Sequence, residues 1–159
     1  MPKQVVIDCD PGTDDAIAIL LALASPELSV LAITVAGGNA GLDQTLPNAL
    51  ALTALAGSAV PVHAGADRPL LGRFTGEPHV HGEDGLGGII LPPGGSPAPE
   101  LAPDAIRRIL RNATEPVTLV GIGPATNLAL ALTTEPALAP RVERIVLMSG
   151  AWAEGNVTP

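Results

Sequence analysis

Short apolar segments alternate with helical patterns along most of the chain, and this order restricts the fold more than any other feature. Apolar, β-branched runs predict buried strands, and longer apolar segments between turn residues predict helices. The expected strands are residues 4–7, 30–35, 61–63, 117–120 and 144–148. The expected helices are residues 15–24, 44–56, 103–112 and 124–133. This alternation predicts an α/β fold: a mostly parallel, Rossmann-like open sheet with helices on both faces.

The apolar character of these segments predicts how they pack. The expected strands are continuously apolar, which is typical of a sheet covered on both faces. The helix over residues 15–24 is apolar nearly all round, so we expect it to pack on more than one side. Asp14 is expected to cap this helix. The last strand, residues 144–148, is also expected to be buried.

The middle of the chain is less regular. Residues 64–101 hold many Gly and Pro residues and are expected to form a flexible loop. Within it, residues 92–99 read Pro-Pro-Gly-Gly-Ser-Pro-Ala-Pro, which excludes a regular helix or strand. No internal repeat is present, so residues 1–159 are expected to form a single domain.

Composition excludes several classes of partner. The formal net charge is −8, and the chain has one Trp, one Phe and no Tyr, which argues against a nucleic-acid partner. Cys9 is the sole cysteine, so no intramolecular disulfide forms. The start of the chain does not resemble a signal peptide, and the longest apolar run, residues 16–24, is too short to span a bilayer. We therefore expect a cytoplasmic protein with no membrane partner.

Polar and glycine-rich segments follow the predicted strands. In open parallel sheets, ligands bind in the crevice beyond the carboxyl ends of the strands. Four segments are expected at that edge: residues 8–15, 37–41, 121–127 and 149–159. Distant parts of the sequence are therefore predicted to meet at one site.

Four carboxylates lie within eight residues of one another in the first of these segments: Asp8, Asp10, Asp14 and Asp15. Like charges so close repel unless something neutralises them, and carboxylate oxygens suit a hard divalent cation. A purely structural role is the alternative, because acids favour the start of a helix. An EF-hand or an aspartyl phosphatase would need another residue type at Gly12, so neither pattern fits.

Other polar or apolar candidates have structural alternatives when taken alone. Asn39 is of a type common in turns, and an exposed His81 in a loop would usually have no role. Thr126 could bond the backbone at a helix start, and Met148 could simply pack in a core. Residues 121–126 do not complete a dinucleotide-binding glycine pattern, because the sixth position is Thr126.

The segment Asp-Cys-Asp-Pro-Gly-Thr-Asp-Asp-Ala, residues 8–16, is similar to the N-terminal signature of the inosine–uridine nucleoside hydrolases. Further segments resemble successive motifs of that family, in family order, across the whole chain: residues 36–39, 79–87, 123–129, 146–150 and 155–159. The resemblance implies calcium-dependent hydrolysis of the N-glycosidic bond of ribonucleosides, giving ribose and a free base.

The same resemblance implies roles for individual residues. Asp10 would be the general base and also a calcium ligand. Asp15 would bind calcium through its carboxylate, and Thr126 through its backbone carbonyl. Asp14 and Asn39 would bind the ribose hydroxyls or order the attacking water.

Residues of the later motifs would contact the substrate. His81, Met148 and Asn156 would line the sugar and base pocket. Asp8 would support the calcium ligands from behind. The resemblance further implies a homo-oligomer, either a dimer or a tetramer.

The chain departs from the family in length, since related enzymes are about twice as long. This difference implies the N-terminal half of the fold, as a fragment, an engineered piece or a frameshifted product. The chain alone is then expected to be inactive and to expose apolar surface beside residues 144–148. Two alternatives stay open: a catalytically incomplete fragment that binds calcium or nucleoside, and a magnesium-dependent phosphohydrolase.

Overall fold

The computed structural model describes residues 1–71 and 78–153. Within these residues a single parallel sheet is formed by five strands: β1 (Lys3–Cys9), β2 (Leu28–Val35), β3 (Val62–Ala64), β4 (Val117–Gly121) and β5 (Val142–Leu147). Their order across the sheet is β3-β2-β1-β4-β5. Strands β2 and β3 are therefore added in turn on one side of β1, and β4 and β5 are added on its other side. This reversal places a topological switch point between β1 and β4.

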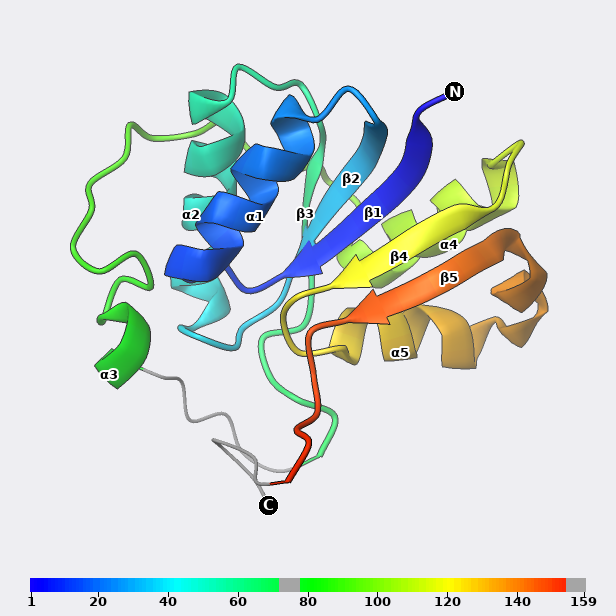
Figure 1. Cartoon of the computed structure of the whole chain (residues 1–159). Coiled ribbons are helices and arrows are strands. Elements are labelled where there is room, and N and C mark those ends of the chain that lie inside the picture. The colour runs from blue at the N-terminus through cyan, green and yellow to red at the C-terminus, as the bar shows by residue number, and fades with distance from the viewer. Residues whose placement is uncertain (72–77, 154–159) are drawn as a thin grey trace.

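Helices lie on both faces of the sheet, as Figure 1 shows. The helices are α1 (Thr13–Ala24), α2 (Leu42–Leu55), α3 (Pro78–His81), α4 (Ala102–Asn112) and α5 (Thr126–Thr134), followed by the 3₁₀ helix η1 (Pro136–Arg141). Helices α1 and α2 cover one face, and α4 and α5 cover the other (Figure 1). The predicted parallel α/β sheet is thus confirmed, and the bounds of the expected strands and main helices differ by at most two residues.

Each face of the sheet has its own hydrophobic core. Successive side chains of a strand point to opposite faces. In β1, Val6 therefore packs with α4 and α5, whereas Val5 and Ile7 pack on the side of α1 and α2. The largest side chains of both cores are fully buried: Ile19, Ile33, Leu52, Ile106, Leu110 and Leu119.

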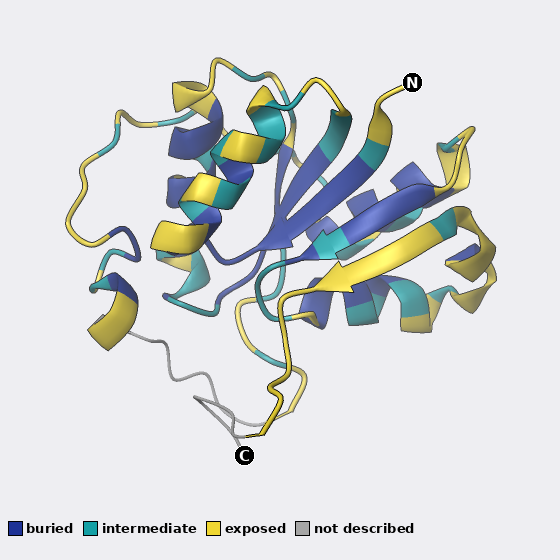
Figure 2. Cartoon of the chain, in the orientation of Figure 1, coloured by how far each residue is buried: buried dark blue, intermediate teal, exposed yellow. Residues whose placement is uncertain are grey.

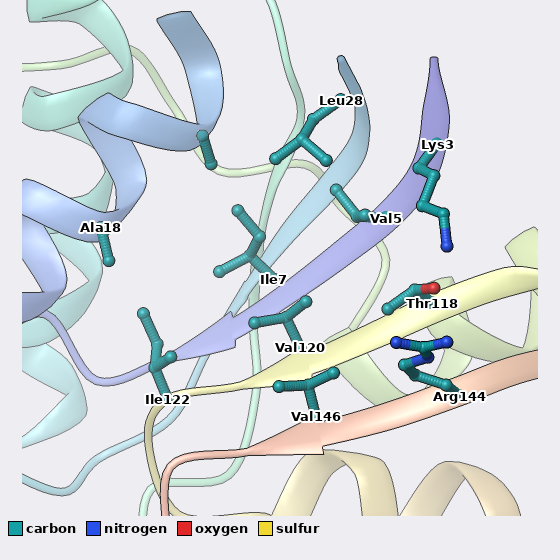
Figure 3. Close-up of a pocket in the computed structure, with 11 residues that line it drawn as sticks. Lys3, Val5, Ile7, Ala18, Leu28, Thr118, Val120, Ile122, Arg144 and Val146 are labelled. Carbon is teal, nitrogen blue, oxygen red and sulfur yellow. The ribbon is translucent and has the colours of Figure 1, made fainter. Parts of the chain in front are cut away.

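The cover of the α1 face is uneven. Helices α1 and α2 lie over β1, β2 and β3, and no helix of the described residues lies over β4 and β5 on that side (Figures 1 and 2). The sheet forms the floor of an open apolar groove there, which is drawn in Figure 3. The side chains along this floor are Val5, Ile7, Val120, Ile122 and Val146. The polar chains of Lys3, Thr118 and Arg144 border one end of it.

This uneven cover corrects two expectations about burial. Strand β5 was expected to be buried, but Ile145, Val146 and Leu147 are each nearly half exposed, because β5 is an edge strand. Helix α1 was expected to pack on several sides. Ile19 is fully buried against the sheet, whereas Ile17 and Leu21, one turn apart on the outer side, are 67% and 70% exposed.

Local structure differs from expectation at two further points. The residue that caps α1 is Gly12, so Asp14 lies inside the first turn of the helix rather than before it. His81 ends the four-residue helix α3 instead of lying in a loop. Apart from α3 and the last residue of β3, the described residues of the glycine- and proline-rich stretch form no helix or strand, and Ala98 makes an isolated parallel bridge to His63. In the part of the chain that the structure describes, no helix is long and apolar enough to cross a membrane.

Candidate active site

The acidic turn, residues 8–15, lies at the switch point and runs from the end of β1 into the first turn of α1. The backbone N–H of Ile122 donates to the carbonyl of Asp8 at 2.8 Å, and the N–H of Ala36 donates to the carbonyl of Cys9 at 2.9 Å. These bonds continue the sheet pattern past the ends of β4 and β2. The turn is therefore held between the two segments that follow its neighbouring strands.

Asp10 lies in a narrow space at the centre of this edge, formed by Gly38, Gly123 and Asn39 and called here the Asp10 seat. Its side chain lies between Gly38 and Gly123, where a Cβ on either glycine would overlap the carboxylate. The backbone N–H of Asn39 donates to Asp10 Oδ2 at 2.7 Å, and Asn39 Nδ2 donates to the Asp10 carbonyl at 3.0 Å. Asp10 is only 4% exposed. The two glycines and Asn39 thus fix the carboxylate in one orientation.

Asp15 lies next to Asp10 on the first turn of α1. Its Oδ2 accepts hydrogen bonds from the Gly12 backbone N–H at 3.2 Å and from Asn39 Nδ2 at 3.3 Å. Its Oδ1 is buried and accepts no hydrogen bond from the described residues. Asn39 therefore bridges both aspartates, and Asp15 presents one oxygen that has no hydrogen-bond donor among the described residues.

Burial of these carboxylates raises their pKa values. Burial, and then repulsion by Asp15, raises the pKa of Asp10 to about 8, although the Asn39 backbone N–H opposes the change. Burial raises the pKa of Asp15 to about 6, against the hydrogen bond from Gly12. The pKa of Asp8 is also raised to about 6 by burial. At neutral pH, Asp10 would therefore keep its proton unless a positive charge replaced it.

His81 reaches the same turn from helix α3. Its Nδ1 accepts a hydrogen bond from the Thr13 backbone N–H at 3.4 Å and lies 3.2 Å from Thr13 Oγ1. The carboxylate of Asp14 lies 3.9 Å from the same nitrogen. His81 is 9% exposed, so it is a packed residue of the site and not an idle surface histidine.

A pocket of roughly 890 Å³ opens beside Asp10, which is enough space for a small ligand. Five of the residues predicted from the sequence line it: Asp10, Asp14, Asn39, His81 and Met148. The loop after β4 and the end of β5 supply the opposite wall, with Ile122, Pro124 and Leu147. The polar groups therefore share the pocket with an apolar wall.

Three of the other predicted residues, Asp15, Thr126 and Asp8, do not line this pocket. Asp15 lies beneath Asn39 and is 1% exposed. Thr126 begins α5 and is 8% exposed, and Asp8 is fully buried behind the turn. Asn156 lies outside the described residues.

Several residues that shape the site were not singled out from the sequence. Gly38 and Gly123 lie against Asp10, and Thr13 contacts His81. Asn48 Nδ2 donates to the carbonyls of Pro11 at 3.4 Å and Asp84 at 2.8 Å, and so joins the acidic turn to the loop after α3. The glycines were visible as turn residues, but close approach to a carboxylate has no local sequence signal.

The aspartate side chains of the acidic turn could offer only oxygen donors to a metal ion. In the described residues no group of three or more His, Cys, Asp or Glu side chains is arranged to hold a metal ion. A cation here would take carboxylate oxygens from Asp10 and Asp15 and complete its shell with carbonyl or water oxygens. Calcium accepts such mixed oxygen ligands, and the buried, unpartnered Oδ1 of Asp15 fits that use.

Comparison with known proteins identifies the family. The family model described as inosine-uridine preferring nucleoside hydrolase matches residues 5–159. The chain belongs to the inosine-uridine preferring nucleoside hydrolase family. The family resemblance predicted from the sequence motifs is therefore confirmed.

Relatives of this nucleoside hydrolase chain align with all of it. The pyrimidine-specific ribonucleoside hydrolase RihA of Shewanella baltica (strain OS155) is 48% identical over 161 residues, which make up 51% of that protein. The RihA protein of Salmonella arizonae is 49% identical over 161 residues, or 52% of its length. The chain thus spans about half the length of the curated relatives it matches.

Solved structures share the fold of this nucleoside hydrolase chain. A plant nucleoside hydrolase, PpNRh1, matches with a TM-score of 0.93 and 40% identity, over 100% of this chain and 52% of the plant enzyme. The purine-preferring ribonucleoside hydrolase of Gardnerella vaginalis matches with a TM-score of 0.92 and 34% identity, over 98% of this chain and 52% of that protein.

Proposed function

We propose that this chain supplies the water-activating part of a site that hydrolyses ribonucleosides to ribose and a free base. The observation that carries the proposal is the seat of Asp10. Its carboxylate is buried between two glycines, oriented by Asn39 and open to the pocket. A general base must be held at a fixed position beside the attacking water, and the fixed orientation of Asp10 supports this role.

Calcium is the cation that we propose for the acidic turn. The carboxylates of Asp10 and Asp15 and the backbone carbonyl of Thr126 would hold it. When bound, a divalent ion orients the attacking water and lowers its pKa. The support is the buried oxygen of Asp15 that accepts no hydrogen bond from the described residues, together with the mutual repulsion of the two carboxylates.

Asp10 would accept the proton from that water. The Asn39 N–H occupies its Oδ2, which leaves Oδ1 as the oxygen that we assign to the proton transfer. A positive charge beside Asp10 would lower its raised pKa and keep it ionised near neutral pH. The base is therefore effective only when the turn is neutralised.

The pocket walls suggest how a nucleoside would lie. Asp14, whose side chain is 54% exposed, and the half-buried Asn39 would bind the ribose hydroxyls. The negative cluster would also stabilise the oxocarbenium character of the ribose in the transition state. His81 and Met148 would contact the sugar and the base. The relatives include pyrimidine-specific and purine-preferring hydrolases, so the proposal names ribonucleosides as a class.

The test uses a chimera in which this chain precedes the remaining half of the Salmonella arizonae relative. Base release from inosine and uridine is measured at saturating calcium and with a chelator. We expect Asp10→Asn to lower kcat by about 10²–10⁴-fold, the usual range for loss of a general base. Asp104→Asn, on the surface of α4, serves as the matched control and should keep kcat. Retention of more than half of kcat by Asp10→Asn would remove Asp10 from this role.

A further inference from the structure

Asn127 is a fully buried polar side chain with no part in the mechanism described above. It is the second residue of α5 and has no solvent exposure. Its amide lies at the point where the ends of β1 and β2 and the segment after β3 meet. Residues as far apart as 119 positions in the sequence are joined there.

Each polar atom of the Asn127 amide has a partner. Nδ2 donates to Asp8 Oδ1 at 2.9 Å and to the Val35 carbonyl at 3.2 Å. Oδ1 accepts from the backbone N–H of Ala66 at 2.8 Å. Only an amide supplies two donors and an acceptor in this arrangement. An asparagine here is therefore required by its hydrogen bonds and not by its volume alone.

The backbone is shaped to admit this amide. Gly65 faces it so closely that a Cβ at Gly65 would overlap the Asn127 side-chain oxygen and nitrogen. The N–H of Gly37 also donates to the Ala66 carbonyl at 2.8 Å, which links the same segment to the loop after β2. The amide is thus fixed from several sides.

We propose that Asn127 is a positioning residue that holds the Thr126 carbonyl at the acidic turn. The peptide unit that carries the Thr126 carbonyl contains the backbone nitrogen of Asn127. Anchoring the Asn127 side chain to Asp8 therefore fixes that carbonyl relative to the end of β1, two residues before Asp10. The inference rests on the proposed function, because it assigns the Thr126 carbonyl to the calcium ion.

The contact with Asp8 explains why the neutral amide is needed. Asp8 Oδ1 accepts from Thr34 Oγ1 at 2.6 Å as well as from Asn127. An aspartate at position 127 would instead bring two buried carboxylates together. Partners behind metal ligands typically change metal affinity by about 10–100-fold when they are altered. The same range is expected here.

The test is calcium titration calorimetry on the chain itself, at a temperature where circular dichroism shows each variant folded. We expect Asn127→Ala and Gly65→Ala to weaken calcium binding by about tenfold or more. Gly65→Ala displaces the amide without removing any of its hydrogen-bonding groups. Gly95→Ala is the matched control, because a Cβ there has no atom within 4 Å. It should bind calcium within about twofold of the unaltered chain.

An exchange variant separates positioning from general destabilisation. Asn127→Asp should bind calcium more weakly than Asn127→Ala at the same degree of folding. The double variant Asp8→Asn/Asn127→Asp exchanges the amide and the carboxylate between the two positions, so the contact again pairs an amide donor with a carboxylate acceptor. It should recover at least about tenfold in calcium affinity relative to Asn127→Asp. Recovery of thermal stability without recovery of calcium affinity would overturn the proposal.

The outcomes distinguish this inference from the proposed function. If the unaltered chain binds no calcium, the proposed calcium site fails in this chain, and the role of Asn127 fails with it. If the unaltered chain binds calcium and the folded variants Asn127→Ala and Gly65→Ala bind it equally well, only the role of Asn127 is overturned.

Discussion

Two hollows of this molecule are built in opposite ways. The acidic pocket at the strand ends gathers side chains from five separate segments, and hydrogen bonds hold Asp10 and the adjacent Asp15 in place. The groove on the sheet face is mostly apolar, with polar side chains at one end, and Val146 on its floor is 46% exposed (Figure 3). The strand-end pocket is thus geometrically defined by the described residues, whereas the groove is only partly covered by them.

The pocket and the groove are also unfavourable for different energetic reasons. In the pocket, burial of carboxylates is unfavourable until a cation or protons neutralise them. In the groove, the cost is apolar area left in water, roughly 25 cal/mol per Å². The first cost depends on pH and on metal ions, and the second does not. Of these two features, measurements that vary pH or calcium therefore probe the pocket and not the groove.

The largest expected effect is a fall in stability as pH rises in the absence of calcium. The folded-state pKa values of Asp10, Asp15 and Asp8 are raised above the value of 3.8 expected when unfolded. The folded chain then binds more protons than the unfolded chain. The stabilising contribution is complete below about pH 4 and is lost as pH rises through about 6 and 8. The total loss should be on the order of several kcal/mol.

Urea unfolding with a chelator at about pH 5 and at about pH 8.5 measures this loss. Calcium should cancel most of it, because the cation replaces the protons. Asp10→Asn should flatten the dependence, whereas Asp104→Asn on the surface of α4 should not. A free energy of unfolding that is constant or rises between these pH values would show that the carboxylates are neutralised in another way.

A smaller effect is expected from the glycines that seat Asp10. In the chimera, Gly123→Ala places a methyl group where the Asp10 carboxylate lies. Because the carboxylate must move, kcat should fall by about 100-fold, the usual result of a misplacement of about 1 Å. Gly95→Ala, which faces open space, should leave kcat unchanged. Equal kcat values for the two variants would mean that the seat does not orient the base.

The pocket was easier to predict from the sequence than the groove. Strand and helix order was predictable because β-branched runs and Gly or Pro boundaries are local signals. The acidic turn was predictable for the same reason, since its four aspartates are close in sequence. Exposure of Ile17 was not predictable, because an apolar residue carries no local sign of whether another element covers it.

Contacts between distant residues set the remaining limit. The burial of His81 depends on Thr13, which lies 68 positions away. The role assigned to Asn127 depends on Asp8 and Ala66, which no spacing rule connects. The motifs named Asn127 only as part of a segment, and its hydrogen bonds became visible once the strand ends were placed together.

The smallest expected effect concerns the groove. Val146 lies on its floor, nearly half exposed, beside Val120 and Arg144. Exposed apolar surface of this kind favours association between molecules, so the chain should show concentration-dependent self-association. Val146→Lys should reduce that association while changing the free energy of unfolding by no more than about 0.5 kcal/mol. Ile17→Lys, on the exposed side of α1 and outside the groove, is the matched control. Sedimentation velocity over a range of concentrations measures both variants, and an equal reduction by both would show that general solubility, and not the groove, governs association.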